Sequence, residues 1–379
     1  MAKVKKNPFQ FGDPVEGRYY LERPELSNYV GQLLDSRIHS VLIGPRRFGK
    51  TSFALNLLNE KEAQNRSGLF VDIFNVTSHR DFLHQILRSF RKKTSWRARL
   101  KKWIENIPRL KWKLSMEIDD VGQPIWGLST NVSAQTDIKE AIQDVLASLA
   151  SLDDQVIVVI DEFQKVAELE DGGWLEATLR THMQQLKNTV FLFTGSRQSM
   201  IYDMINNASR PFYRSCQPIE FPAFGPEFTD WVIQRFEQVG ITAEKSAIQY
   251  LRACVQDSPN YVQMAGFHLV AQGVKKVGQE EVDDILKTIV RQNAYAYQTL
   301  LNTLTSIQQR ALRLAAQSKA QVFAKDLLQK FEIPSGAALA SAFKALKDRQ
   351  ILDEGTAKGK VVFDDPLFEI WLKTEFGEG

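Results

Sequence analysis

Cysteine is nearly absent from the sequence: Cys216 and Cys254 are the only two in 379 residues, and they form no CxxC spacing. A disulfide framework and a cysteine-rich zinc site are therefore excluded. The five histidines show no H-x₃-H or H-E-x-x-H spacing, which argues against a metal site built by the protein alone. His182 and His268 fall in helical apolar patterns, so we expect packed or capping residues there. No G-x-S-x-G occurs either, which excludes a nucleophile elbow.

Long hydrophobic runs are missing as well. The longest uninterrupted aliphatic run covers residues 156–160, far short of the ~20 residues that cross a bilayer. The opening MAKVKKN is basic, but no apolar segment follows it, so we predict no secretory signal. From these absences we expect a cytoplasmic protein with no membrane partner.

What the sequence does contain is ample core material and one strongly basic segment. Hydrophobic residues make up 44% and charged residues 25%, which excludes a chain that is mainly disordered. At about 150 residues per domain, the length predicts two to three domains. Residues 88–113 carry eleven Lys or Arg against one acidic residue, so a net charge of +3 leaves about −7 on the remainder. A segment of one sign on an otherwise acidic chain indicates an anionic partner.

Short aliphatic runs alternate with helical stretches over the first 221 residues. Continuous apolar runs of this length are typical of strands buried on both faces of a parallel sheet, and helical crossovers between them make the predicted fold class α/β. The runs are HSVLIG (39–44), GLFVDIF (68–74), VIVVID (156–161), TVFLFTG (189–195) and PIEF (218–221). The sequence of residues 226–297 indicates helices and no strands. From residue 304 on, we expect helices over 305–316, 323–331 and 337–349, then two short strands. The predicted domains are residues 1–222, 223–298 and 299–379.

A phosphate-binding loop follows the first aliphatic run. Residues 44–51 read GPRRFGKT and match G-x-x-x-x-G-K-[ST], in which glycines let backbone amides face phosphate oxygens at a helix N-terminus. Lys50 would reach the β- and γ-phosphates, and the Thr51 hydroxyl would hold Mg²⁺. The sequence therefore predicts a nucleotide site with ATP and Mg²⁺ as ligands. The predicted nucleotide-contacting residues of the loop are Gly44, Pro45, Arg46, Arg47, Phe48, Gly49, Lys50, Thr51 and Ser52.

The matching acidic residues end the strand VIVVI. Asp161 would hold Mg²⁺ together with Thr51, and Glu162 would orient and deprotonate the attacking water. A second acid after the first favours hydrolysis over nucleotide sensing. The next run ends in TGSR, which places Thr194 or Ser196 where a polar side chain positions the water.

Two arginines precede the fifth strand in the segment RPFYR. Arg210 or Arg214 would reach the γ-phosphate of a neighbouring subunit as an arginine finger, which implies a homo-oligomer. The alternative for each is a surface arginine paired with a carboxylate.

At this point the sequence resembles a family. GPRRFGKTS, VIVVIDEFQKV, FLFTGSRQSM and RPFYRSCQPIEFPAF look like the archaeal-type P-loop ATPases of the AAA+ and STAND groups, related to the Orc1/Cdc6 initiators. The resemblance implies a P-loop AAA+-like parallel sheet core, a helical lid and a C-terminal winged-helix domain. It also implies that the opening segment FGDPVEGRYYLERPEL packs over the adenine, with Val15 as a contact. One departure lies in the lid, where initiator-type relatives place an arginine and this chain has residues 258–261, SPNY.

Residues 88–131 predict a basic β-hairpin insertion, in which tryptophans alternate with cations. Cations with stackable aromatics suit a nucleic-acid backbone. The predicted DNA contacts are Arg97, Arg99, Lys101, Lys102, Lys111 and Lys113. A solvated helix whose tryptophans pack on the core is the alternative.

The winged helix gives a second set of predicted DNA contacts. Ser335 is the expected N-cap of the presumed recognition helix, whose first half is alanine-rich and poorly equipped to contact base edges. Lys358 and Lys360 of the wing would contact phosphates. Such modules in this family also dock proteins.

Together these features predict a Mg²⁺-dependent ATPase that assembles on DNA and recruits or regulates an unidentified protein partner, as in transposition, replication or mobile-element defence. The alternative is a STAND-type signalling switch, whose winged helix docks a protein effector without binding nucleic acid.

Overall fold

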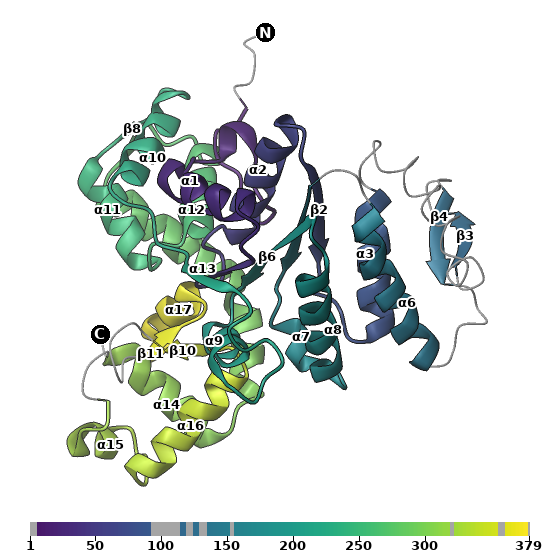
Figure 1. Ribbon diagram of the computed structural model, residues 1–379. Helices are drawn as coiled ribbons and strands as arrows, with labels where there is room; N and C mark the ends of the chain where they lie inside the picture. The colour runs from purple at the N-terminus through teal and green to yellow at the C-terminus, as the bar shows by residue number, and fades with distance from the viewer. Residues whose placement is uncertain are drawn as a thin grey trace. The chain divides into compact units, whose positions relative to one another are not determined.

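A computed structural model describes residues 6–91, 114–118, 124–128, 135–151, 155–318, 322–354 and 361–377 (Figure 1). The chain divides into two compact units. One contains residues 14–222, and the other joins residues 1–13 to residues 223–379. The boundary after residue 222 coincides with the expected end of the first domain. The predicted DNA contacts Arg97, Arg99, Lys101, Lys102, Lys111, Lys113, Lys358 and Lys360 lie outside the described residues.

A five-stranded parallel sheet forms the centre of the unit that spans residues 14–222, as the α/β class predicts. Its strands lie in the order β2-β5-β6-β1-β7. All residues of β1, β5 and β6 are buried, whereas the edge strand β7 buries only Ile219. The five predicted strands are confirmed within a few residues, as β1 (Ser40–Ile43), β2 (Ser67–Asp72), β5 (Val156–Asp161), β6 (Thr189–Gly195) and β7 (Gln217–Glu220).

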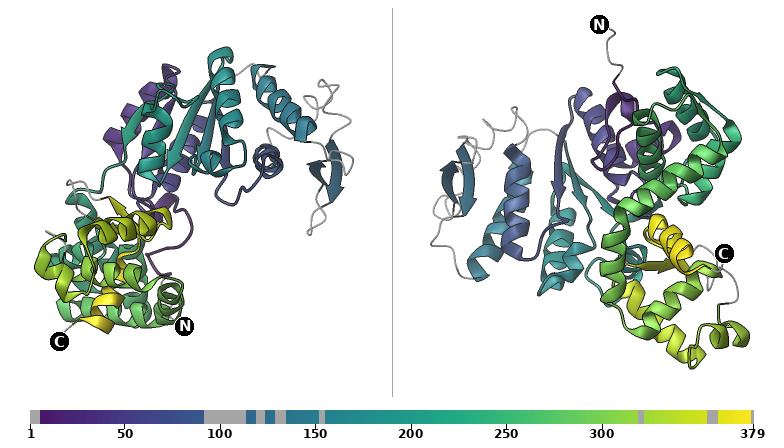
Figure 2. Two further views of the ribbon diagram at one scale, coloured as in Figure 1. Left: turned by 90° about the horizontal axis from the view of Figure 1, so that it is seen from below. Right: turned by 180° about the vertical axis from the view of Figure 1, so that it is seen from behind.

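Helices cover both faces of this sheet (Figure 2). Alternate residues of β5 enter two different hydrophobic clusters: Val156, Val158 and Ile160 pack with one set of helices, and Ile157 and Val159 with the other. This two-residue alternation explains why the strand is apolar throughout. One cluster gathers α3 (His79–Arg91), α6 (Gln135–Ala147), α8 (Gly172–Gln185) and α9 (Gln198–Asn206), and the other α1 (Pro24–Asp35) and α2 (Lys50–Ala63).

The predicted hairpin insertion is present in the described part of residues 88–131. Strands β3 (Leu114–Ile118) and β4 (Pro124–Leu128) pair antiparallel, with Ile118 opposite Pro124 and Leu114 opposite Leu128. The sequence of β3, LSMEI, alternates apolar and polar residues, which is the pattern of a strand.

The second unit is largely helical. Within residues 226–297, where the sequence predicts helices only, it also contains a short parallel pair, β8 (Thr242–Ala243) with β9 (Lys276–Val277). Two residues are too few to give a strand periodicity, so this pair left no sequence signal. The helices are α10 (Glu227–Glu237), α11 (Lys245–Cys254), α12 (Pro259–Ala271), α13 (Gln279–Asn302), α14 (Ser306–Gln317), α15 (Lys325–Lys330), α16 (Gly336–Asp348) and α17 (Pro366–Phe376).

Residues 7–12 belong to this helical unit. Phe9 is 2% exposed, and its ring packs against that of Phe236 at a tilt of 56°. The backbone amides of Gln10 and Gly12 donate to Gln263 Oε1 (3.3 Å) and Asn260 Oδ1 (2.9 Å). The opening segment thus supplies a core residue to the expected lid, although it precedes the P-loop in sequence.

The elements predicted for the winged helix all form. Ser335 caps α16 by accepting a hydrogen bond from the amide of Ala338 at 3.1 Å, as expected. The strands β10 (Leu352–Glu354) and β11 (Val361–Phe363) pair antiparallel after it. Tyr261 of α12 and Tyr297 of α13 both donate to Asp365, at 2.7 and 3.1 Å. The expected lid and winged helix are therefore joined by hydrogen bonds within one unit.

Among the helices of the described residues, none is long and apolar enough to cross a membrane.

His39, just before β1, yields a prediction on stability. Its Nδ1 accepts from the amide of Phe191 (3.1 Å) and its Nε2 donates to the carbonyl of Met183 (3.1 Å), which requires the neutral ring. Burial lowers the pKa of His39 below its ordinary 6.5. A group with a depressed histidine pKa contributes stability above the unfolded pKa and loses it as pH falls. We expect the free energy of unfolding, measured by urea denaturation, to fall between pH 7 and pH 5, and to fall less in His39→Gln. Parallel pH profiles for the two proteins would contradict this.

Candidate nucleotide site

The loop between β1 and α2 is shaped by two glycines. A Cβ on Gly44 would lie 2.9 Å from the Cβ of Phe221 and 3.1 Å from its carbonyl oxygen, so only glycine fits beside β7. Gly49 has φ +92°, a left-handed conformation that side chains rarely adopt, and it leads directly into α2 at Lys50. The predicted phosphate loop therefore has the strand–turn–helix context that the motif requires.

Lys50 lies under this loop and is 5% exposed. Its ammonium group donates to the carbonyl oxygens of Gly44 and Pro45, at 2.8 and 2.7 Å. The ammonium group of Lys50 is thus bound by the loop's own carbonyl groups, at the N-terminus of the 14-residue helix α2.

Val15, in the opening segment, contacts Ser52, in the first turn of α2. The amide of Val15 donates to Ser52 Oγ (3.0 Å), and Asn56 Nδ2 donates to the Val15 carbonyl (3.0 Å). The predicted opening segment therefore does reach the P-loop helix at Val15. Its contact with adenine stays a prediction.

Asp161 is the centre of the site. It ends β5, is 3% exposed, and accepts a hydrogen bond from the Thr51 hydroxyl at 2.7 Å. The hydroxyl of Thr194, at the end of β6, donates to its other carboxylate oxygen. The predicted metal residues Thr51 and Asp161 are thus in direct contact, although 110 residues separate them in sequence.

Burial raises the pKa of Asp161 to about 6, partly offset by the hydroxyls of Thr194 and Thr51 and increased by the charges of Glu162 and Asp72. A buried carboxylate without a cation is unfavourable, and its ionised form is stabilised by a metal ion. Mg²⁺ takes oxygen ligands and is typically held by one or two protein groups plus phosphates and water. The hydroxyl of Thr51 and the carboxylate of Asp161 fit that requirement. In the described part of the chain, no group of three or more His, Cys, Asp or Glu forms an alternative cluster.

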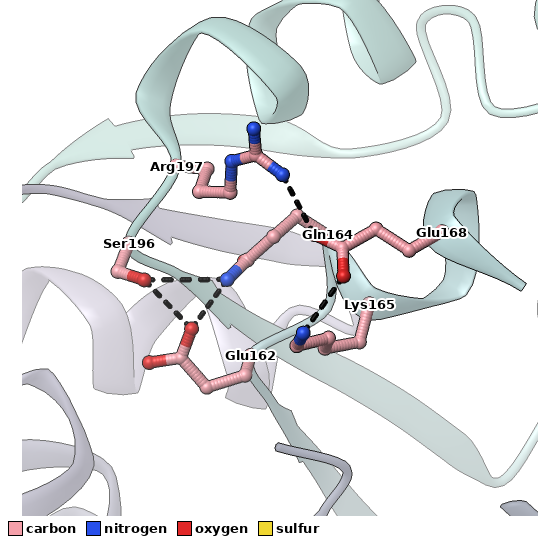
Figure 3. A network of polar contacts seen from close by, with 6 residues as sticks. All are labelled: Glu162, Gln164, Lys165, Glu168, Ser196 and Arg197. Atoms are coloured by element: carbon pink, nitrogen blue, oxygen red, sulfur yellow. Dashed lines mark hydrogen bonds and ion pairs between the residues drawn. The ribbon is translucent and has the colours of Figure 1, made fainter. Parts of the chain in front are cut away.

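Glu162 follows Asp161 in a left-handed conformation, with φ +59°. Its Oε2 accepts from the Ser196 hydroxyl (2.7 Å) and from the side-chain amide of Gln164, which also donates to Ser196 Oγ at 3.2 Å (Figure 3). The sequence analysis left open whether Thr194 or Ser196 positions the attacking water. In the structure Thr194 bonds Asp161, and Ser196 bonds Glu162.

Gln164 is a site residue that the sequence analysis missed. It lies in the turn between β5 and α7 (Lys165–Glu168) and is 2% exposed. Its neighbour Phe163 packs on Phe193 and Phe212, with ring centroids 4.3 and 4.8 Å apart, which anchors the turn. The available sequence signal was a glutamine two residues after the predicted base, Glu162.

The two candidate finger arginines have different surroundings. Arg210 forms an ion pair with Glu176, which is 1% exposed, and a longer contact of 3.8 Å with Asp203. Arg214 is exposed, has φ +51°, and lies over the ring of Tyr213. The paired-carboxylate alternative therefore describes Arg210. In the loop, Arg46 lies 5.8 Å from the ring centroid of Phe74, and Arg47 has φ +62°.

His182 is buried in α8, where burial lowers its pKa, in keeping with the expected packing role.

Comparison with known proteins supports this interpretation of the fold. Residues 34–200 match a family model described as an AAA domain, and residues 295–374 match one described as a probable winged helix domain. No curated protein matches the chain. Among solved structures, the Walker-type ATPase of Pyrococcus abyssi is similar at 17% identity and a TM-score of 0.65, over 94% of this chain and 96% of that one.

Two structures from Aeropyrum pernix are also similar. The Orc1 protein in complex with DNA aligns at 13% identity and a TM-score of 0.53, over 94% of each chain. The Orc2 protein, solved as ADPNP–ADP complexes, aligns at 15% identity and a TM-score of 0.50, also over 94% of each chain. At these identities the likeness concerns the fold, and it confirms the expected core with a C-terminal winged helix.

The contact between Thr194 and Asp161 predicts a stability difference. We expect Thr194→Val to lower the free energy of unfolding by about 1.5–3 kcal/mol, because a hydrogen bond to a buried charged group is lost. Thr189→Val is the matched control. It lies on the same strand and is 1% exposed, but its hydroxyl donates to the neutral side chain of Asn188 at 3.3 Å. The control should lose about 1 kcal/mol or less. Equal losses in urea unfolding would contradict the assignment.

Proposed function

The chain carries a P-loop AAA domain followed by a winged-helix domain, and on that premise we propose that it is a Mg²⁺-dependent ATPase that assembles on DNA and regulates a protein partner. The observation that supports hydrolysis is the contact between Thr51, on the helix after β1, and Asp161, at the carboxyl end of β5. Lys50 directly precedes Thr51 and Glu162 directly follows Asp161, and β1 and β5 are parallel strands on the two sides of β6. Ligands of open α/β sheets bind at the carboxyl ends of the strands.

The residues divide the chemistry among them. The amides of residues 45–51 and the Lys50 ammonium would bind the β- and γ-phosphates, and Thr51 and Asp161 would hold the metal. Bound Mg²⁺ supplies neutralisation of the negative charge on the phosphoryl oxygens. Glu162 would accept a proton from the attacking water, whose oxygen it orients towards the γ-phosphate. Catalysis of this kind depends on positioning and electrostatics rather than on a covalent intermediate.

The proposal includes assembly with a second copy of the chain. Arg210 already pairs with the buried Glu176, and withdrawing it would leave that carboxylate without its cation. We therefore assign the arginine finger to Arg214, which is exposed near β7. An arginine supplied by a neighbour would make hydrolysis depend on oligomerisation.

Binding to DNA is supported by three features. The similar Orc1 structure contains DNA, residues 295–374 match a winged-helix model, and residues 88–113 carry a net charge of +10. Contacts with phosphates release counterions, so binding through this segment would weaken steeply with salt.

The second candidate function is a nucleotide switch whose winged helix docks a protein. One observation favours it: the exposed side chains of α16 include Ala337, Ala340 and Ser341, with Lys344 as the nearest cation. A helix face of this composition offers few hydrogen bonds to base edges.

DNA should stimulate ATP hydrolysis if the first proposal holds. We expect steady-state hydrolysis by the full chain to rise several-fold with double-stranded DNA at moderate salt, and Lys50→Ala to give no turnover above buffer. A variant with the eleven Lys and Arg of residues 88–113 replaced by Gln should lose the stimulation while retaining the basal rate. Basal hydrolysis that ignores DNA would favour the protein-docking switch.

Mixing two inactive variants tests the assignment of Arg214. We expect Arg214→Ala and Lys50→Ala each to lose about a thousandfold in turnover, within the range for a lost arginine finger. Their mixture should recover activity, because one subunit keeps an intact site and its neighbour keeps the arginine. Arg210→Ala is the comparison and should lower stability instead. Full activity of Arg214→Ala alone would remove that residue from the role.

A further inference from the structure

Among the described residues, the carboxylate of Glu162 is held through one oxygen. Both hydrogen bonds to the carboxylate, from Gln164 Nε2 and Ser196 Oγ, end on Oε2 (Figure 3). Its other oxygen, Oε1, accepts no hydrogen bond from the residues that the structure describes. A general base needs one oxygen directed at the water and a fixed orientation for the rest of the group. The arrangement at Glu162 has both properties.

We propose that Gln164, acting with Ser196, is the positioning residue of the hydrolytic base: the two side chains fix Oε2 of Glu162 so that Oε1 faces the attacking water. This inference rests on the proposed ATP hydrolysis. Neither side chain takes part in the proton transfer, which runs from water to Glu162.

The burial of Gln164 supports a functional role rather than a structural one. Its Nε2 makes two of the three hydrogen bonds in the triangle with Glu162 and Ser196, whereas its Oε1 is buried and has no hydrogen-bond partner among the described residues. A buried polar atom without a partner destabilises the fold. An apolar side chain of the same length would avoid that cost, so stability alone does not explain a glutamine here.

Two ion pairs with Glu168 connect the residues next to Gln164 and Ser196. Lys165, next to Gln164, donates to Glu168 Oε2 at 2.7 Å, and Arg197, next to Ser196, donates to Glu168 Oε1 at 2.7 Å. Glu168 therefore ties the turn after β5 to the turn after β6 (Figure 3). The backbone bond from the Phe163 amide to the Thr194 carbonyl, at 2.8 Å, joins the same two turns.

These ion pairs of Glu168 predict that different substitutions lower turnover to different extents. Loss of Arg197 would free one side of Glu168 but leave Gln164 and Ser196 in place, so its effect should be smaller than that of removing either donor to Glu162. Lys139→Ala is the matched control, because Lys139 forms a comparable ion pair, with Asp171, that involves neither Glu168 nor a residue next to Gln164 or Ser196.

The experiment compares turnover, ATP affinity and stability in the full chain with DNA present. We expect Gln164→Met and Ser196→Ala each to lower kcat by about 10–100-fold, the usual loss when a supporting hydrogen bond to a reacting group is removed. The dissociation constant for ATP, from fluorescent-nucleotide titration, should stay within twofold. The Tm of Gln164→Met should equal or exceed that of the wild type. Arg197→Ala should lose less than tenfold in kcat, and Lys139→Ala should match the wild type.

A double variant tests whether both residues act through Glu162. The Gln164→Met/Ser196→Ala protein should lose less than the product of the two single fold-changes, because both act on one carboxylate. A wild-type kcat in Gln164→Met, or a loss of kcat that parallels losses of ATP affinity and Tm, would overturn the inference and leave the proposed ATPase intact. A wild-type protein without Lys50-dependent hydrolysis would overturn the proposed function and this inference together.

Discussion

The buried carboxylate of Asp161 is the constraint on which the site depends. At 3% exposure the group needs hydrogen-bond donors and a cation, and two of its donors come from separate elements, Thr51 on α2 and Thr194 on β6. Satisfying one carboxylate therefore fixes the P-loop helix, β5 and β6 relative to one another. The same contacts leave the carboxylate beside the curve of the loop, where phosphate oxygens and a metal ion would supply the remaining partners.

From Asp161 the chain passes directly to Glu162, the proposed base. The left-handed backbone of Glu162 ends β5, and the turn that follows is anchored by Phe163 among other buried aromatic rings. Gln164 is carried into contact with Glu162 by that turn, and Ser196 by the equivalent turn after β6. The two carboxylates thus accept hydrogen bonds from different side chains: Asp161 from the threonines of the proposed metal site, and Glu162 from an amide and a hydroxyl.

Much of this could be predicted from the sequence, for identifiable reasons. The five strands were visible because strands buried on both faces are continuously apolar, and the pairing of Thr51 with Asp161 followed from the P-loop motif and the acidic end of a buried strand. Ser335 was recognised because capping is local. The partners of Gln164 and Arg210 could not be predicted, since they depend on which distant side chains meet in space. The packing of Phe9 in the helical unit was missed for the same reason.

The central claim is that this site hydrolyses ATP with Glu162 as base. The most direct test compares the wild type with Glu162→Gln, measuring ATP binding and phosphate release on the same samples with Mg²⁺ and DNA. The account predicts equal affinities for ATP, and a release rate at least a hundredfold lower in the variant, within the range for general-base catalysis. Release at the wild-type rate by Glu162→Gln, or no binding of ATP by either protein, would contradict it.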